Sequence, residues 1–277
     1  MGRKQLRTGD ISQNNKDNHG NADCPHNVTG PALLGSSDII VNDENAMRTG
    51  DLGVHVACCG LNQWRCVEGS KTVIFNNKYA ARKDDQTLHC GGLGNSKMGS
   101  SDVLVGGPTI NILSESRNNA IRMLQNCQEA LERWNADDQA RFREWFGTTD
   151  ETARQTIRDR TTREIAAIQE DSNEDFRLLE PAHNNPNYGA YVYGSRTENR
   201  QVFLGSYFNY SATPDGGQDS QSSMIVHEYS HFDNIGNTVD HAYGRNACRN
   251  LAQTDSTRAL ENADNFENWA DSVYNNQ

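Results

Sequence analysis

The sequence predicts a multidomain protein in which a small all-β domain precedes a mainly α, α+β domain. The first part is rich in glycine and repeats a pattern of short apolar runs separated by turns. The second part carries apolar residues at helical spacing over about 114–176, followed by two alternating runs between 188 and 208. We therefore expect a flexible segment at 1–23, the small β domain at 24–107 and the second domain at 108–277.

Composition restricts the classes of partner. The chain has 277 residues, a formal net charge of -11 and a mean hydropathy of -0.83. Residues 108–277 hold 15 Arg, no Lys and 26 acidic residues, so this acidic part argues against nucleic acid or an anionic membrane as ligand. No apolar run approaches the ~20 residues that span a bilayer, and the basic N-terminus lacks the apolar core of a signal peptide. We expect a route of export other than general secretion.

The first domain contains an internal repeat. Gly35–Asp51 reads G-S-S-D-I-I-V-N-D-E-N-A-M-R-T-G-D, and Gly69–Asp85 reads G-S-K-T-V-I-F-N-N-K-Y-A-A-R-K-D-D. Gly99–Gly107, G-S-S-D-V-L-V-G-G, is a truncated third copy. Each copy predicts a short strand, a tight turn and a second short strand.

Histidine and cysteine stand ahead of each copy of the repeat. They are Cys24 and His26, then His55, Cys58 and Cys59, and finally His89 and Cys90. If each repeat brings one or two ligands to a common point, they form one tetrahedral zinc site, which would stabilise a domain with little core. The alternative is exposed histidines and reduced cysteines in loops.

The repeated G-S-x-x-V-x-x-N, A-x-R-x-x-D and H-C-G-G elements resemble the PAAR family over about residues 20–107. These are conical, zinc-tipped β domains that cap the spike of type VI secretion systems. The resemblance implies a spike protein trimer as partner and a structural zinc held by three His and one Cys, which map best onto His26, His55, His89 and Cys90. His19 and Cys24 are alternatives for the first ligand. Asp84 stands where the family usually has Gly.

The second domain begins after Pro108 with predicted helices. A helix from Ser114 ends at Gly147, and T-T-D-E at 148–151 predicts the N-cap of another that continues to about Phe176. The runs G-A-Y-V-Y-G and Q-V-F-L-G-S-Y-F predict a hairpin, and an edge strand of this kind could hold an extended peptide by main-chain pairing.

The strongest motif is H-E-x-x-H, which places His227 and His231 on one face of a helix with Glu228 beside them. A catalytic zinc needs three protein ligands and an open position. The carboxylate of Asp240, beyond the turn at Gly236, could complete the set. Glu228 could then act as general base towards water, and Tyr243 could donate a hydrogen bond to the developing oxyanion.

The extended pattern H-E-x-S-H-F, T-x-D-H-A-Y-G and N-A-D-N-x-E resembles the aspzincins, the deuterolysin and peptidyl-Lys metalloendopeptidase family. The likeness runs from about Glu129 to the C-terminus and implies a zincin fold. It assigns His227, His231 and Asp240 as zinc ligands, Glu228 as base and Tyr243 as the transition-state tyrosine. Asn237 stands where the family usually has Gly.

Lysine preference is predicted by two features. In lysine-specific aspzincins, acids of the N-A-D-N-F-E motif line the pocket for the residue after the scissile bond, which points to Asp264 and Glu267. Alternatively, Asp264 braces the C-terminal helix. All six lysines lie in residues 4–97, so we hypothesise that a Lys-directed peptidase has lost the bonds that it could cut in itself. The active enzyme could still clip its first domain, for instance before Lys97.

Together these features predict a type VI secretion effector, a toxin with one catalytic and one structural zinc that cleaves target proteins on the N-terminal side of Lys. Its expected partners are the spike trimer, a protein substrate in a recipient cell and an immunity protein, with no nucleic acid or membrane. We expect it in the bacterial cytoplasm before delivery. The alternatives are a broad, deuterolysin-like peptidase and a catalytically inactive spike-tip adaptor.

Overall fold

The computed structural model describes residues 2–18, 25–56, 62–178, 189–208, 210 and 220–275. The chain forms two compact units. The first comprises Met1–Glu115, Asn173–Ala190 and Val202–Pro214, and the second comprises Ser116–Ser172, Tyr191–Gln201 and Asp215–Gln277. The first unit therefore extends past the boundary predicted after residue 107 and includes two later segments. Within the ranges described, no helix is long and apolar enough to cross a membrane.

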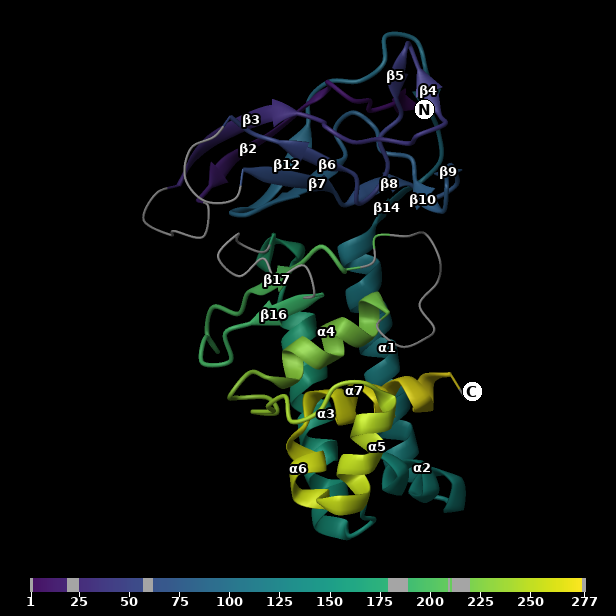
Figure 1. The fold of residues 1–277 in the computed structure, drawn as a ribbon, viewed down its shortest axis with the longest axis vertical. Coiled ribbons are helices and arrows are strands. Elements are labelled where there is room, and N and C mark those ends of the chain that lie inside the picture. The colour runs from purple at the N-terminus through teal and green to yellow at the C-terminus, as the bar shows by residue number, and fades with distance from the viewer. Residues whose placement is uncertain are drawn as a thin grey trace. The chain divides into compact units, whose positions relative to one another are not determined.

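The first unit contains a six-stranded antiparallel sheet (Figure 1). The strands lie in the order β3 (His26–Pro31), β2 (Ile11–Asp17), β12 (Gly92–Ser96), β11 (Gln86–His89), β7 (Gln63–Cys66) and β6 (Leu52–Val54). The side chain of Trp64 on β7 is fully buried, opposite Gly53 on β6. A Cβ at Gly53 would lie 2.0 Å from the Trp64 ring, so only glycine fits there.

Three two-stranded ladders correspond to the three copies of the repeat. They are β4 (Ile40–Val41) with β5 (Glu44–Asn45), β9 (Ile74–Phe75) with β10 (Lys78–Tyr79), and β13 (Leu104–Val105) with β1 (Arg3–Lys4). The two hairpins turn through Asn42-Asp43 and Asn76-Asn77, and all four residues have positive φ. Two-residue turns of this kind match the twist of the flanking strands, and Asn and Asp tolerate the conformation.

The N-terminal segment is therefore ordered, and the prediction of a flexible segment at 1–23 is wrong for its described part. Residues 3–10 supply the second half of the third copy, which looked truncated because its halves lie at opposite ends of the repeat region. Leu6 is fully buried. Its N–H donates to the carbonyl of Ala81 (2.9 Å), Ala81 donates to Met47 (3.0 Å) and Met47 donates back to Leu6 (2.8 Å). These bonds close a ring through the three copies.

The same Arg–Asp pair braces each copy. Nε of the arginine lies 3.2, 2.9 and 3.0 Å from Oδ2 of the aspartate in Arg7–Asp10, Arg48–Asp51 and Arg82–Asp85. Each aspartate also accepts the backbone N–H of its arginine. Since these contacts are local, every copy folds its turn in the same way.

The first unit continues into the helical region through one more ladder. After Pro108, β14 (Thr109–Asn111) pairs with β8 (Glu68–Ser70) and leads directly into α1 (Ile112–Arg133). This helix begins slightly before the predicted start at Ser114.

The predicted first helix is two helices. The chain breaks at Trp134, whose φ is 44°, and Asn135 caps α2 (Ala136–Phe146) with a capping box to Asp138. Gly147 ends α2 in the left-handed conformation, as predicted.

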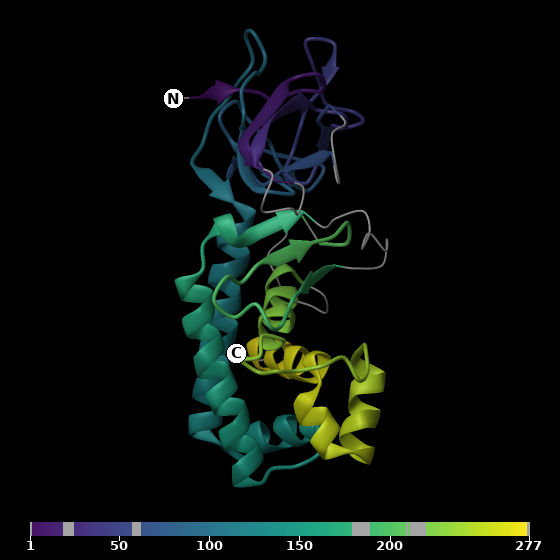
Figure 2. The ribbon, with the colours of Figure 1, turned by 90° about the vertical axis from the view of Figure 1, so that its left-hand side faces the viewer.

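The next helix is capped as the sequence predicts but ends earlier. The side chain of Asp150 caps α3 (Glu151–Glu170), which ends at Asp171 rather than near Phe176. The helices α1 and α3 lie side by side (Figure 2), where Nε of Arg154 donates to the Leu131 carbonyl at 2.9 Å.

Short strands follow these helices. A 3-10 turn, η1 (Asn173–Asp175), leads into β15 (Phe176–Leu178), which pairs in parallel with β17 (Val202–Leu204). On the other side of β17 lies β16 (Ala190–Val192), so the two predicted strands are neighbours in a three-stranded sheet. Strand β15 was not predicted, because the preceding helix was expected to continue to about Phe176.

The C-terminal helices complete the second unit and hold the motif. They are α4 (Gln221–Ser230), α5 (Arg245–Thr254), α6 (Ser256–Glu261) and α7 (Ala263–Tyr274). Helix α4 packs against α7. The ring of Trp269 on α7 contacts Phe142, Phe146 and Phe266 at centroid distances of 5.8, 5.7 and 6.0 Å. This aromatic cluster fixes α7, and with it the acids that face the motif.

Candidate active site

Helix α4 carries the motif and is buried along nearly its whole length. Ser220 caps its N-terminus by accepting the N–H of Ser223, and His231 follows its last turn. His227 and His231 are therefore one turn apart, with ring centroids separated by 4.9 Å. The helix ends at Ser230 with His231 as its C-cap, and the chain turns back at once.

The returning chain brings a carboxylate to the two imidazoles. Val239 pairs with the segment before α7, since its N–H donates to Glu261 and its carbonyl accepts from Ala263. Next to this anchor, Oδ1 of Asp240 lies 3.3 Å from Nε2 of His227 and 3.5 Å from Nε2 of His231. The structure thus brings together the three residues predicted as ligands of the catalytic zinc.

The other ring nitrogens are held by the protein. Nδ1 of His231 lies 2.9 Å from the carbonyl of Thr238. Nδ1 of His227 lies 3.0 Å from Oε2 of Glu267 and 3.2 Å from Oδ1 of Asp264. Partners at Nδ1 fix each ring and leave Nε2 available as a ligand, as is usual for histidines that bind metal.

These residues fit a zinc ion. One donor atom each from His227, His231 and Asp240 lies within 4.8 Å of the others, and two imidazoles with one carboxylate match the donors of catalytic zinc sites. When bound, zinc supplies Lewis-acid chemistry, which makes water nucleophilic near neutral pH and polarises a peptide carbonyl.

Glu228 is suited to proton transfer beside this centre. Its side chain is buried, and burial raises the pKa of its carboxyl to about 7, although the neighbouring His227 lowers it. A carboxyl with this pKa can take a proton from water and return it to the leaving amine near neutral pH.

Asp240 and Tyr243 differ in character from Glu228. Burial acts to raise the pKa of Asp240, but the hydrogen bond and charge of His227 outweigh it and lower that pKa to about 2. Asp240 is therefore ionised at neutral pH, as a ligand must be. Tyr243 is exposed, hydrogen-bonds Asp240 and stacks on His227 with centroids 6.4 Å apart. Its phenol is placed to donate to an oxyanion near the centre.

Asp264 and Glu267, predicted to line a lysine pocket, lie one turn apart on α7 and face His227. Both are buried. Asp264 also accepts the N–H of Gly244 at 2.5 Å, so it fixes the loop that carries Tyr243. These contacts with His227 were not predicted, although the spacing of the two acids, which places both on one side of a helix, was a signal for them.

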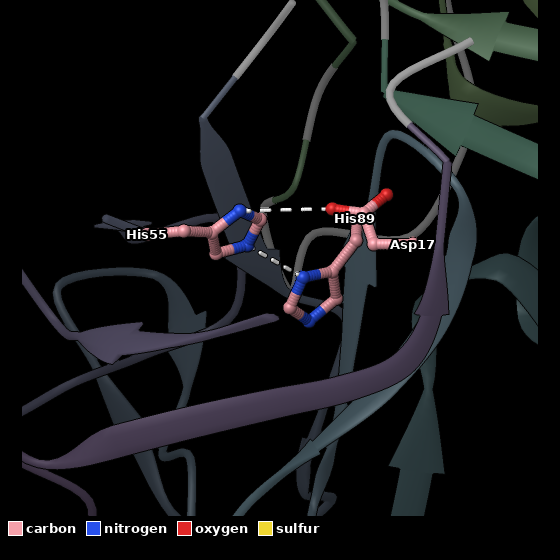
Figure 3. Close-up of side chains that lie close together, drawn as sticks. All are labelled: Asp17, His55 and His89. Atoms are coloured by element: carbon pink, nitrogen blue, oxygen red, sulfur yellow. Dashed lines mark hydrogen bonds and ion pairs between the residues drawn. The ribbon is translucent and has the colours of Figure 1, made fainter. Parts of the chain in front are cut away.

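A second cluster of possible ligands lies in the first unit. Asp17, His55 and His89 are buried and offer one ligand atom each within 4.8 Å (Figure 3). Nε2 of His55 is 2.8 Å from Nδ1 of His89, and Nδ1 of His55 is 3.6 Å from Oδ2 of Asp17. Two of the four predicted ligands of the structural zinc, His55 and His89, are therefore together.

The other two predicted ligands are not part of this group. His26 lies on β3, paired in register with Asp17 on β2, and Cys90 is fully buried directly after β11. The alternatives His19 and Cys24 lie outside the described residues, as do Cys58 and Cys59. Asp17 was missed because it lies outside the repeat and because only His and Cys were considered as ligands of this zinc.

An H-E-x-x-H helix, a third ligand from the turn that follows and a buried glutamate beside them define a metallopeptidase. Residues 132–271 match the family model described as lysine-specific metallo-endopeptidase, the aspzincins. Because this match covers half of the chain, the chain belongs to that family and is a metalloendopeptidase by class.

Known proteins match this chain over stretches of different length. It is 36% identical over 133 residues to an extracellular protease of Aeromonas hydrophila, a match that covers 48% of this chain and 36% of that protein. It is 42% identical over 83 residues to a peptidyl-Lys metalloendopeptidase of Grifola frondosa, covering 30% and 22%. It is 39% identical over 95 residues to the NAD(P)(+) glycohydrolase toxin Tse6 of Pseudomonas aeruginosa, covering 31% and 21%. The chain thus spans well under half the length of these relatives.

Proposed function

We propose that the protein is a toxin delivered by a type VI secretion system, and that its second unit hydrolyses proteins of a recipient cell on the N-terminal side of lysine. The observation that carries the proposal is the convergence of His227, His231 and Asp240 beside the buried Glu228. The zinc held there is the catalytic ion of this proposal, and a second, structural zinc belongs to the first unit.

Preference for lysine is supported by charge and by similarity. Asp264 and Glu267 place two carboxyls beside the centre, and an ammonium group entering there would find a charged partner that a neutral side chain cannot use. The family description and the name of the Grifola frondosa relative both refer to lysine.

Delivery on a spike tip is supported by the first unit. The ring of hydrogen bonds through Leu6, Met47 and Ala81 gives this unit three similar sectors. Each sector exposes a large apolar side chain at the same position of its repeat, Ile40, Ile74 and Leu104, with 54%, 50% and 60% of the residue exposed. A trimeric spike protein offers three equivalent surfaces to such a face. Similarity to a protein named as a toxin supports the role of a toxin.

The proposal also covers synthesis, export and immunity in the producing cell. The protein is made in the bacterial cytoplasm and leaves with the secretion machine, and an immunity protein protects the producer. The competing functions are a broad peptidase without lysine preference and an inactive adaptor in which only the first unit matters.

Proteolysis is tested with the full-length protein loaded with zinc. We expect a denatured protein mixture to be cut with Lys enriched directly after the scissile bonds, and Glu228→Gln to remove this activity while still binding zinc. The control is Glu261→Gln, an exposed acid that we expect to be silent. Cleavage without enrichment of Lys would favour the broad peptidase, and no cleavage by the zinc-loaded wild type would favour the adaptor.

A further inference from the structure

Lysine is distributed very unevenly between the two parts of the chain. All six lysines lie in residues 4–97, whereas residues 108–277 contain 15 arginines and no lysine. A general preference for arginine would also have removed lysine from the first part. The cause must therefore act on the second part alone.

Each of the six remaining lysines lies in a strand or donates its backbone N–H to a hydrogen bond. The N–H groups of Lys71, Lys83 and Lys97 donate to the carbonyls of Pro108, Lys4 and Ile11, at 2.9, 2.7 and 2.7 Å. Lys4 in β1 pairs with Leu104, and Lys78 in β10 pairs with Phe75. Lys16 lies in β2 at the irregularity between Asn14 and Asp17, where its N–H donates to Oδ1 of Asn14 at 2.9 Å. Several of these side chains are exposed, but every lysine lies in a strand or donates its backbone N–H to a carbonyl of another segment.

A peptidase binds its substrate as an extended segment, so a bond in a ladder must first detach from its partners. Detachment requires local or global unfolding, whose free energy in a buried sheet approaches that of the whole unit. Ser96, on the other side of the bond before Lys97, is fully buried and bonded to Asp85. That bond, which the sequence alone marked as a site of self-cleavage, is thus closed while the first unit is folded.

We propose that the protein is built to resist its own peptidase: the second unit has no lysine, and the first keeps its lysines in hydrogen-bonded backbone, so that the first unit becomes a substrate only on unfolding. This inference rests on the lysine preference proposed above. The reaction is hydrolysis, in which the C–N bond before Lys breaks, the carbonyl carbon gains the water oxygen and the lysine nitrogen gains a proton.

The first test places a lysine in an exposed loop of the second unit. Glu198 is exposed between β16 and β17, outside any strand or helix. We expect zinc-loaded Glu198→Lys to be cut between Thr197 and residue 198 more than about tenfold faster than Glu198→Arg, because a loop opens at little cost. Arg143→Lys, on the exposed face of α2, is a folded control that we expect to stay intact.

The second test unfolds the first unit of an inactive substrate. Full-length Glu228→Gln with the added change Leu6→Asp, which places a charge in a fully buried position, is mixed with wild-type enzyme. We expect cuts before the lysines of residues 4–97 and none in the second unit, whereas Glu228→Gln alone stays intact. Adding Lys97→Arg should remove the cut after Ser96 only.

Cleavage of a synthetic peptide with one Lys and one Arg distinguishes a failure of self-resistance from a failure of the proposed lysine preference. If wild type cuts the peptide before Lys but leaves Glu198→Lys as stable as Glu198→Arg, self-resistance is refuted and the proposed function stands. If wild type does not cut the peptide before Lys, the proposed specificity itself fails. Rapid cleavage of the folded first unit would also overturn the inference.

Discussion

At the scale of single residues, the environment of His227 decides what the acids of α7 do. Glu267 and Asp264 both reach Nδ1 of this ligand, and both are buried. A carboxylate at Nδ1 fixes the ring and makes the other nitrogen a better donor to metal. Glu267 therefore positions a ligand, whatever else it contributes to specificity.

We expect Glu267→Gln to weaken zinc binding about 10- to 100-fold, the usual cost of losing such a partner. Competition with a chromophoric chelator measures this affinity without any assay of activity. Glu261→Gln is the matched control, because Glu261 is an exposed acid near the same helix. Unchanged zinc affinity together with loss of the preference for Lys would instead assign Glu267 to the substrate pocket alone.

Two residues depart from glycine in the family patterns, yet both keep the backbone that glycine would adopt. Asp84 has φ 69° and Asn237 has φ 49°. Asn and Asp are the side chains that tolerate this left-handed region best. The turns at the Arg82–Asp85 pair and after α4 are therefore preserved although the residue differs.

At the scale of elements, the sequence predicted what depends on local pattern. The cap at Asp150 and the left-handed end at Gly147 are confirmed, because capping uses residues three or four positions apart. The break at Trp134 and the strand β15 were missed, since these depend on packing and pairing with distant residues. The pattern of strand, turn and strand in each repeat copy was likewise visible in the sequence. The completion of the third copy by β1 was not.

The group of possible ligands formed by Asp17 on β2, His89 on β11 and His55 after β6 gives a prediction at this scale. Because Asp17, His55 and His89 form a group of possible ligands that does not include Cys90, we expect Asp17→Asn to lose the proposed structural zinc and Cys90→Ala to retain it. Metal analysis of the purified full-length variants, with intact binding at the catalytic site as reference, provides the measurement. Loss of zinc in Cys90→Ala but not in Asp17→Asn would restore the predicted ligand set.

At the scale of the whole molecule, the catalytic centre was predictable because its ligands lie within one short stretch, His227 to Asp240. The carboxyls that hold these ligands were not predictable, because Glu267 reaches His227 only through the packing of α7 on α4. In the first unit, the repeat can likewise be recognised in the sequence. The ring of backbone hydrogen bonds through its three copies forms only when the chain folds.

Docking of the first unit is expected to depend on its three exposed apolar residues together. We predict that the triple change of Ile40, Ile74 and Leu104 to Asp abolishes binding to the trimeric spike protein, since charges at an apolar contact are not compensated. Each single change should weaken binding less. The matched control is Val56→Asp, an exposed apolar residue outside the repeat, and equal loss in that variant would argue against a specific face.

The closing of the ring by the first strand also affects how the chain can be made. Arg3 pairs with Val105, so the N-terminal strand leaves the ribosome long before its partner exists. At about 5–20 residues per second, the nascent chain waits roughly 5–20 s for residue 105. Leu6 can bond Met47 and Ala81 only after those residues have been made, and its strand gains its partner at residue 105 last, so the ring through the three copies closes late in synthesis.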